Sequence, residues 1–177
     1  MTVTVRRVRA DDWAVVRDVR LMALADAPSA FGSSYAAEVG RDDAFWIDRA
    51  ARSSAGDVGT TYLATLGDDP EPDRVAPDRV VGLVSAFRPV PGVVELVSMW
   101  TSPTARRSGA ARRLVGAVVD WEAAGPATGV ELWVTRGNEP AYRLYRSCGF
   151  AETGEHQPLP SDPCKDEIRM RLDVAGS

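Results

Sequence analysis

Residues 93–124 have the sequence VVELVSMWTSPTARRSGAARRLVGAVVDWEAA, in which three stretches of different character follow one another. The first, Val93–Thr101, is rich in β-branched and apolar residues and predicts a strand. The last repeats apolar residues at helical spacing from Ala111 onward and predicts an amphipathic helix that ends at Gly125 and Pro126. Between them lies a loop of small residues that also carries arginines. The segment therefore predicts a strand, a basic loop and a helix in direct succession.

The loop at residues 102–111 leads directly into the N-terminus of the predicted helix. A helix N-terminus has unpaired backbone N–H groups and a partial positive charge, and small residues allow an anion to approach that backbone closely. Further positive charge comes from Arg106, Arg107, Arg112 and Arg113. We predict an anion site suited to a diphosphate; the alternative is a tight strand-to-helix turn with solvated arginines. The loop matches neither GxxxxGK[ST] nor GxGxxG, so Walker-type and dinucleotide sites are not expected.

The rest of the chain predicts one α/β domain over residues 1–177, with the element order βααβββαβαββ. The strands are expected at residues 3–8, 60–66, 80–87, 93–101, 130–135, 151–155 and 168–172. The helices are expected from Asp11 or Asp12 to before Pro28, from Asp42 or Asp43 to about Ser53, and at residues 111–124 and 140–147. Residues 30–40 are expected to form a loop with aromatic anchors. Residues 67–78, acidic and rich in proline, are expected to form a mobile hairpin loop.

Composition and charge exclude several classes of protein. The chain has 21 Lys and Arg against 25 Asp and Glu, a net charge of −4, whereas a nucleic-acid-binding domain is usually basic. Its longest apolar run, residues 80–87, is too short to span a membrane, and its first ten residues lack a signal-peptide core. Cys148 and Cys164 form no CxxC motif and predict a reducing, cytoplasmic compartment. No residues have metal-ligand spacing, so no metal is expected.

Two motifs give the chain a resemblance to a known family. Arg106-x-x-Gly109-x-Ala111 matches the pattern [RQ]-x-x-G-x-[GA], and residues 138–150, NEPAYRLYRSCGF, match N-x-x-A-x-x-[LF]-Y-x-x-x-G-F at the usual distance. With the element order, these motifs make the chain resemble the GNAT superfamily of N-acetyltransferases, most strongly over residues 93–155. The resemblance implies the GNAT fold, an α/β (α+β) domain whose mixed, mostly antiparallel sheet is flanked by helices. Two central parallel strands would be splayed around acetyl-CoA.

The resemblance also implies how acetyl-CoA, the acyl donor, would bind. Its pyrophosphate would lie on the backbone amides of the signature loop, whose shape Arg106 would help to set. The loop residues carried over from the family are Arg107, Ser108, Gly109, Ala110, Ala111 and Arg112. The pantetheine arm would pair with strand 93–101 like an added strand, mainly through the backbone of Met99, Trp100 and Thr101. This placement requires a β-bulge in that strand. Asn138 would cap the following helix, contact the arm or hold a water molecule there, and the capping and cofactor roles are compatible.

Three residues are candidates for the chemistry of acetyl transfer. In the family's arrangement the Met99 amide would stabilise the oxyanion that develops on the thioester carbonyl. Tyr145 matches the family tyrosine near the thioester sulfur, where a phenol that is protonated at neutral pH can protonate the leaving thiolate. The alternative is a core tyrosine on an amphipathic helix. Glu95 interrupts an apolar strand and aligns with the base of the histone-acetylating branch. Burial would raise its pKa and make it a better base. The alternatives for Glu95 are a water relay, a ligand for the substrate cation and a solvent-facing residue.

These expectations lead to a small-molecule N-acetyltransferase in which a primary amine attacks acetyl-CoA directly. The alternatives are a protein N-terminal or lysine acetyltransferase and a non-catalytic CoA-binding sensor. No nucleic-acid or membrane partner is expected, and a homodimer is compatible with the family. The loop at residues 30–40, with Phe31 and Tyr35, is expected to shape the acceptor site. Glu38 is expected to be exposed there, and His156 to lie on the surface.

Overall fold

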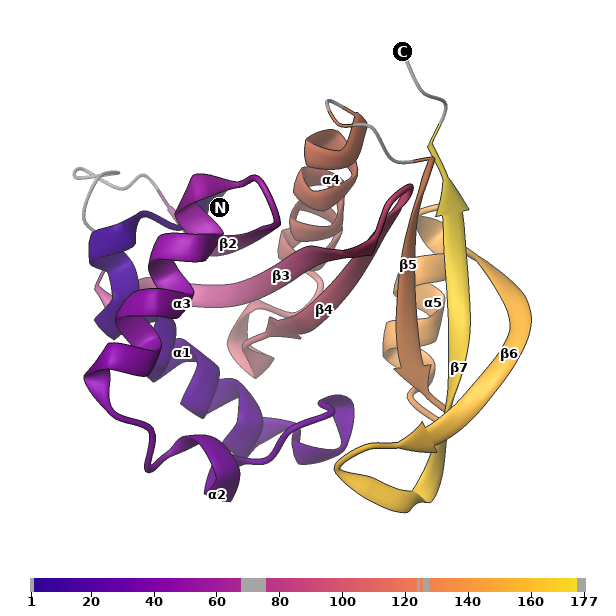
Figure 1. Cartoon of the computed structure of the whole chain (residues 1–177), viewed down its shortest axis with the longest axis horizontal. Helices are drawn as coiled ribbons and strands as arrows, with labels where there is room; N and C mark the ends of the chain where they lie inside the picture. The colour runs from indigo at the N-terminus through magenta and orange to yellow at the C-terminus, as the bar shows by residue number, and fades with distance from the viewer. Residues whose placement is uncertain (1, 68–75, 124, 126–127, 175–177) are drawn as a thin grey trace.

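A computed structural model describes residues 2–67, 76–123, 125 and 128–174, which form one mixed sheet flanked by helices (Figure 1). The strands are β1 (Val3–Arg7), β2 (Gly59–Leu66), β3 (Val80–Val90), β4 (Val93–Thr101), β5 (Gly129–Thr135), β6 (Ala151–Leu159) and β7 (Asp162–Asp173). The helices are α1 (Trp13–Asp26), α2 (Tyr35–Glu38), α3 (Asp43–Ala55), α4 (Ala110–Ala123) and α5 (Glu139–Ser147). The sheet order is β1-β2-β3-β4-β5-β7-β6, in which only β4 and β5 run parallel. The expected fold class and element order are confirmed, with α2 as one additional turn of helix.

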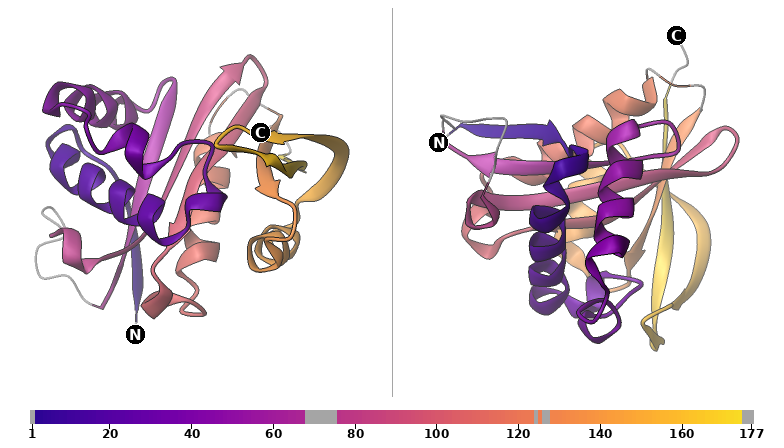
Figure 2. Two further views of the ribbon diagram at one scale, coloured as in Figure 1. Left: turned by 90° about the horizontal axis from the view of Figure 1, so that it is seen from below. Right: turned by 60° about the vertical axis from the view of Figure 1, so that its left-hand side comes forward.

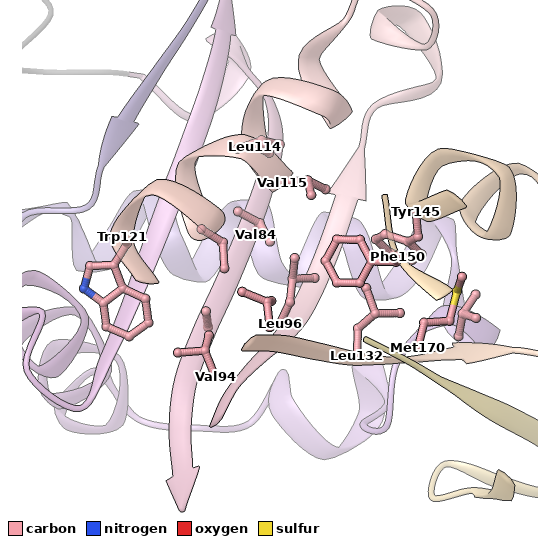
Figure 3. Close-up of a cluster of buried hydrophobic side chains, with 14 of the residues drawn as sticks. Val84, Val94, Leu96, Leu114, Val115, Trp121, Leu132, Tyr145, Phe150 and Met170 are labelled. Atoms are coloured by element: carbon pink, nitrogen blue, oxygen red, sulfur yellow. The ribbon is translucent and has the colours of Figure 1, made fainter. Parts of the chain in front are cut away.

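The sheet has an apolar layer on each face, because successive side chains of a strand point to opposite sides. On β2, Leu63 packs with α1 and α3, whereas its neighbour Ala64 packs with α4. Figure 2 shows α1 and α3 on one side of the sheet and α4 on the other. The α4 face continues to α5, where Tyr145 and Phe150 complete the apolar cluster (Figure 3). Within the described residues, no helix combines the length and the apolar character that a membrane crossing requires.

The segment between α1 and α3 is more regular than its sequence indicates. We expected residues 30–40 to be a loop, but α2 forms within it, and the Ser34 hydroxyl caps this helix by accepting a hydrogen bond from the Ala37 amide at 3.3 Å. The expectation that Glu38 is exposed was wrong. Its carboxylate is buried and accepts two hydrogen bonds from the Arg20 guanidinium, at 2.7 and 3.0 Å. An ion pair between distant residues buries this acid, and no local pattern indicates such a pair.

The closing hairpin is also longer than predicted. β6 and β7 extend to Leu159 and back to Asp162, whereas the sequence indicated strands only at residues 151–155 and 168–172. Most of β6 is exposed and polar, so the apolar alternation that predicts a strand is missing there. Of the predicted acidic hairpin loop at residues 67–78, residues 68–75 lie outside the described part of the chain.

Two irregularities at the centre of the sheet create the space for a site. The parallel pairing of β4 with β5 ends at Leu96 and Leu132, and beyond that point the two strands spread apart (Figure 1). In addition, the pairing of β3 with β4 passes from Ser85–Val97 to Leu83–Trp100, which leaves Ser98 and Met99 without partner residues. Ser98 has φ of 57°, in the left-handed region that few non-glycine residues adopt. The β-bulge that the resemblance requires is therefore present.

Candidate active site

A cavity of about 1140 Å³ opens where β4 and β5 separate. It runs from the start of α4 to the turn between β6 and β7, and its two ends differ in charge. We call one end the loop end, which is lined by Arg106, Arg107, Gly109, Ala111 and Arg112. We call the other the acid end, which is lined by Phe31, Glu95, Trp133, Gln157, Leu159, Pro160 and Glu167. Met99 and Tyr145 also line the cavity.

The loop end presents backbone N–H groups to the cavity. Arg107 and Gly109 have φ of 65° and 90°, and this left-handed backbone leads the chain into α4 at Ala110. The amides of Ala111 and Arg112 lie in the first turn of α4, and the described residues provide no hydrogen-bond acceptor for either. Unpaired amides at a helix N-terminus are a favourable site for an anion. The geometry thus supports the anion-site prediction over a simple turn.

The four arginines around this loop have different surroundings. The Arg112 guanidinium donates to the carbonyl and hydroxyl oxygens of Ser147, at 3.1 and 3.0 Å, and so ties α4 to α5. Arg106 lies 3.5 Å from the Asp26 carboxylate, and Arg113 donates to the Val3 carbonyl outside the cavity. For Arg107, the described part of the chain offers no ion-pair partner. Among the described residues, neither Arg107 nor Arg112 has an acidic partner, so both can neutralise the charge of a ligand in the cavity.

Not every predicted loop residue reaches the cavity. Ser108 and Ala110 belong to the loop but are absent from its lining. Ala110, the first residue of α4, is buried in the apolar cluster, and its amide donates to the Ser108 hydroxyl at 3.3 Å. Close packing beneath the loop depends on Gly82, since a Cβ there would lie 2.9 Å from a Leu114 methyl carbon. These residues support the loop from below.

The bulge in β4 is held from the opposite wall by Arg20. This buried guanidinium donates to the Ser98 hydroxyl at 3.0 Å, is neutralised by Glu38, and stacks over the Phe31 ring at 4.8 Å. Met99, Trp100 and Thr101 follow Ser98 along the cavity wall. The Trp100 indole is buried and donates to Asp26 at 2.9 Å, so its side chain is already engaged elsewhere. Sequence reasoning missed Arg20, because its partners lie on α2 and β4.

Tyr145 and Asn138 are brought to the cavity by α5. Tyr145 is buried and packs on Phe150 with 5.8 Å between ring centroids (Figure 3), and it also lines the cavity. Burial raises the pKa of its hydroxyl well above the ordinary value near 10, so the phenol keeps its proton at neutral pH. Asn138 caps α5, and its Oδ1 accepts a hydrogen bond from the Ala141 amide at 3.3 Å while the residue lines the cavity. Both predicted uses of Asn138 are compatible with this position.

Glu95 is half-buried and lines the acid end. Its neighbours in β4 point into the α4 layer, so the carboxylate lies on the opposite face of the sheet. Burial raises the pKa of the Glu95 carboxyl, and Glu131 on the adjacent strand raises it further, while the Arg169 guanidinium lowers it in part. The hydrogen bonds of Arg169 go to Glu131 and Glu155 instead. Glu95 thus has the burial that was expected of a base.

The sequence did not indicate a second carboxylate in the cavity, that of Glu167. It lies in the middle of β7, opposite Thr135 of β5 and just before the predicted part of that strand. A signal in the sequence was the alternation of Ile168, Met170 and Leu172, which pack on the α4 side of the sheet. Because Glu167 is directly before Ile168, the same alternation places it on the opposite face, which borders the cavity.

Tyr35, Glu38 and His156, by contrast, do not line the cavity, and His156 is exposed. Among the described residues, no group of three His, Cys, Asp or Glu side chains could hold a metal ion.

Comparisons with known proteins show the family of this chain. The family model described as the acetyltransferase (GNAT) family matches residues 29–150. Because this match covers more than half of the sequence, the chain belongs to the GNAT acetyltransferase family. A search of curated protein sequences finds no match.

Solved structures share the fold at low sequence identity. An acetyltransferase of the GNAT family from Streptococcus pneumoniae is 18% identical, with a TM-score of 0.77 over 98% of this chain and 100% of that one. Spermidine N-acetyltransferase from Vibrio cholerae, solved with CoA and spermine, is 16% identical, with a TM-score of 0.71 over 97% and 95%. The ribosomal-protein-alanine N-acetyltransferase from Escherichia coli is 16% identical, with a TM-score of 0.66 over 99% and 96%. The fold is therefore common to enzymes with small-molecule and with protein acceptors.

Proposed function

We propose that this protein is an acetyl-CoA-dependent N-acetyltransferase that acetylates a primary amine of a small molecule. The observation that carries the proposal is one continuous cavity, which joins the unpaired amides of the loop end to Glu95 at the acid end. A phosphate-bearing donor and an amine acceptor would enter from opposite ends. They would meet beside the β4 bulge, where Met99 and Tyr145 lie on the cavity wall.

The donor substrate, acetyl-CoA, fits the loop end. Its pyrophosphate would accept hydrogen bonds from the loop and α4 amides, with Arg107 adding charge. The edges of β4 and β5 beyond Leu96 and Leu132 do not pair with each other, so the pantetheine arm can form strand-like hydrogen bonds between them. The CoA in the Vibrio cholerae relative supports this assignment of the donor.

Transfer would proceed by direct attack of the neutral amine nitrogen on the thioester carbonyl carbon. A C–N bond would form and the carbonyl oxygen would become an oxyanion, which the Met99 amide would stabilise. The amine proton passes to Glu95, directly or through a water molecule. The C–S bond then breaks, and the Tyr145 phenol gives its proton to the CoA thiolate. Glu95 ends protonated and Tyr145 ionised, so one proton must return from Glu95 or solvent to the phenol before the next turnover.

A small acceptor is favoured because two segments meet across the acid end. The Ser161 hydroxyl donates to the Phe31 carbonyl, and the Thr135 hydroxyl donates to the Ser29 carbonyl at 2.8 Å. The chain before α2 is thereby joined to β5 and to the turn between β6 and β7. A protein acceptor would require a groove that is open at this point.

Release of free CoA thiol gives a direct test. The protein is mixed with acetyl-CoA and a panel of small primary amines, and separately with peptides that have free N-termini or lysines. Faster thiol release with small amines is expected, together with a loss of that acceleration in Glu95→Gln. Glu152→Gln, an exposed change of the same type on β6, is the matched control. Acceleration by peptides alone would assign a protein acceptor. Acetyl-CoA binding without any acceptor would indicate a sensor, and no binding would overturn the site.

A further inference from the structure

Glu167 is a buried carboxylate that the proposed chemistry leaves without a role. Its side chain is 7% exposed, it lines the acid end, and its Oε2 has no hydrogen-bond partner among the described residues. Gln157 of β6 lies directly opposite Glu167 in the hairpin, where its amide lowers the pKa of the carboxyl in part. A buried carboxylate with one unsatisfied oxygen is costly unless a donor or a cation completes its surroundings. A carboxylate oxygen that lacks a hydrogen-bond partner, on a residue that lines a cavity, can accept a hydrogen bond from a bound ligand.

The charges around the acid end leave negative charge in excess. Arg20 is fully engaged, because its three guanidinium nitrogens donate to Glu38 and to the Ser98 hydroxyl. Arg169, which lies near Glu95, is bonded to Glu131 and Glu155. In the part of the chain that the structure describes, neither Glu95 nor Glu167 has an ion-pair partner. An acceptor that carried a carboxylate would find no free cation here, whereas a cationic acceptor would find two acids.

The two acids stand on opposite sides of β5. Glu95 on β4 is level with Glu131 of β5, whereas Glu167 on β7 is level with Thr135, four residues further along. Their backbones are therefore separated by about 10 Å across the sheet and by about 13 Å along it. Long side chains shorten this gap, and burial raises the pKa of Glu167 with a further contribution from the charge of Glu95. The walls of the acid end include apolar surfaces of Phe31, Trp133 and Leu159. This geometry suits a short methylene chain with a nitrogen at each end.

We propose that Glu167 is a specificity-determining residue that binds a second, protonated nitrogen of the acceptor. The preferred substrates are then amines that carry another cationic nitrogen a few methylene groups away. One nitrogen is neutral and reacts beside Glu95, while the other stays charged and donates to Glu167. The identification of the acceptor rests on the proposed function, but the binding of the second cation does not.

Three four-carbon amines with the same reacting end test the proposal. Putrescine carries a second ammonium, aminobutanol a hydroxyl and butylamine a methyl group. A hydrogen bond to a charged group contributes roughly 1.5–3 kcal/mol, which corresponds to a preference of about 10- to 100-fold. We expect kcat/KM and the dissociation constant, the latter measured by calorimetry with CoA present, to favour putrescine over aminobutanol by that factor. Equal values for the two amines in the wild-type protein would overturn the proposal.

Variants then assign the preference to one residue. Glu167→Gln keeps the shape and the contact with Gln157 and should bring putrescine to the level of aminobutanol, with butylamine changed by less than about twofold. Glu167→Asp keeps the charge and should retain part of the preference. Glu152→Gln, an exposed change of the same charge on β6, should keep all of it. Retention of the full preference in Glu167→Gln would contradict the assignment.

The two readouts separate this inference from the proposed function. If putrescine binds preferentially and Glu167→Gln removes that preference while no amine is acetylated, the proposed function fails and the cation site stands. If amines are acetylated without a preference for a second charge, the cation site fails and the proposed function stands. If putrescine does not bind, the cation site is overturned whatever the activity.

Discussion

The loop end and the acid end of the cavity are built in opposite ways. The loop end comes from consecutive residues of one segment and presents mainly backbone amides. The acid end comes from side chains of residues 31–33, β4, β5, β6 and β7, which are far apart in the sequence. Backbone amides at the loop end suit an invariant phosphate-bearing substrate. The side chains of the acid end can be changed one at a time by substitution. The difference shows how one fold can keep a common donor while its acceptors vary.

The largest effect is expected at the acid end, where Glu95→Gln removes the proposed base. General-base catalysis contributes about 10²- to 10⁴-fold, so kcat/KM for the amine should fall by that factor while acetyl-CoA binds as before. Steady-state kinetics and calorimetry give the two quantities. Full activity in this variant would show that another group removes the proton. The acid end would then have no catalytic role of its own.

The pH profile sharpens the same prediction. Glu95 accepts a proton only when ionised, and its burial raises the pKa of the carboxyl above the ordinary value of 4.5. Activity of the wild-type protein should therefore fall as the pH decreases through this raised pKa, and that acidic limb should be absent from Glu95→Gln. An identical acidic limb in both proteins would assign it to a different group, for example the amine itself.

Tyr145→Phe tests the point where the two ends meet. Thiols have pKa values near 8.5, so the CoA thiolate needs less help to leave than an alkoxide would, and we expect a fall in kcat of about 10- to 100-fold. The KM for acetyl-CoA should stay the same, because the phenol mainly packs on Phe150. Single-turnover measurements make chemistry the observed step. An unchanged single-turnover rate would remove the general-acid role.

Gly109→Ala tests the loop end in isolation. Gly109 has φ of 90°, and a side chain in left-handed backbone costs roughly 1–2 kcal/mol, so the KM for acetyl-CoA should rise about 5- to 30-fold. The KM for the amine should not change. Gly116→Ala, in the middle of α4 with free space for a Cβ, is the control and should stabilise the fold by about 0.5–1 kcal/mol. Equal changes in both KM values would show that the two ends are not separate.

The smallest effect concerns stability. Burial raises the pKa of Glu167, so its ionised form destabilises the folded protein at neutral pH and protonation relieves this as the pH falls through the raised pKa. Glu167→Gln should therefore increase the melting temperature at pH 7 by at most a few degrees, and the increase should shrink in acid. A lower melting temperature at pH 7 would indicate that the carboxylate stabilises the fold. Thermal unfolding monitored by circular dichroism provides the measurement.

The difference between the loop end and the acid end also explains which parts of the site could be predicted from the sequence. Arg107, Gly109, Asn138 and Tyr145 lie in two local motifs, and the structure places all four on the cavity wall. The sheet also followed from local patterns, because strands with apolar alternation could be recognised. The acid end was only partly predictable, through Glu95 and Phe31.

The remaining features depend on contacts between distant segments. Glu38 is buried because Arg20 lies beside it, and Glu167 faces the cavity because the pairing of β7 with β5 extends as far as Glu167. Glu38 is not distinguished by its neighbours in the sequence, and Glu167 is indicated only by the alternation of the apolar residues that follow it. The bulge at Ser98 is likewise visible only once β3 and Arg20 are in place.

A crystal structure with bound acetyl-CoA tests the central claim most directly. We expect the pyrophosphate on the amides at the start of α4, and the thioester carbonyl oxygen within about 2.7–3.1 Å of the Met99 nitrogen. The acetyl group should face Glu95, with the acid end left open for the acceptor. A pyrophosphate bound away from Gly109, or a carbonyl oxygen turned away from the β4 bulge, would contradict the account.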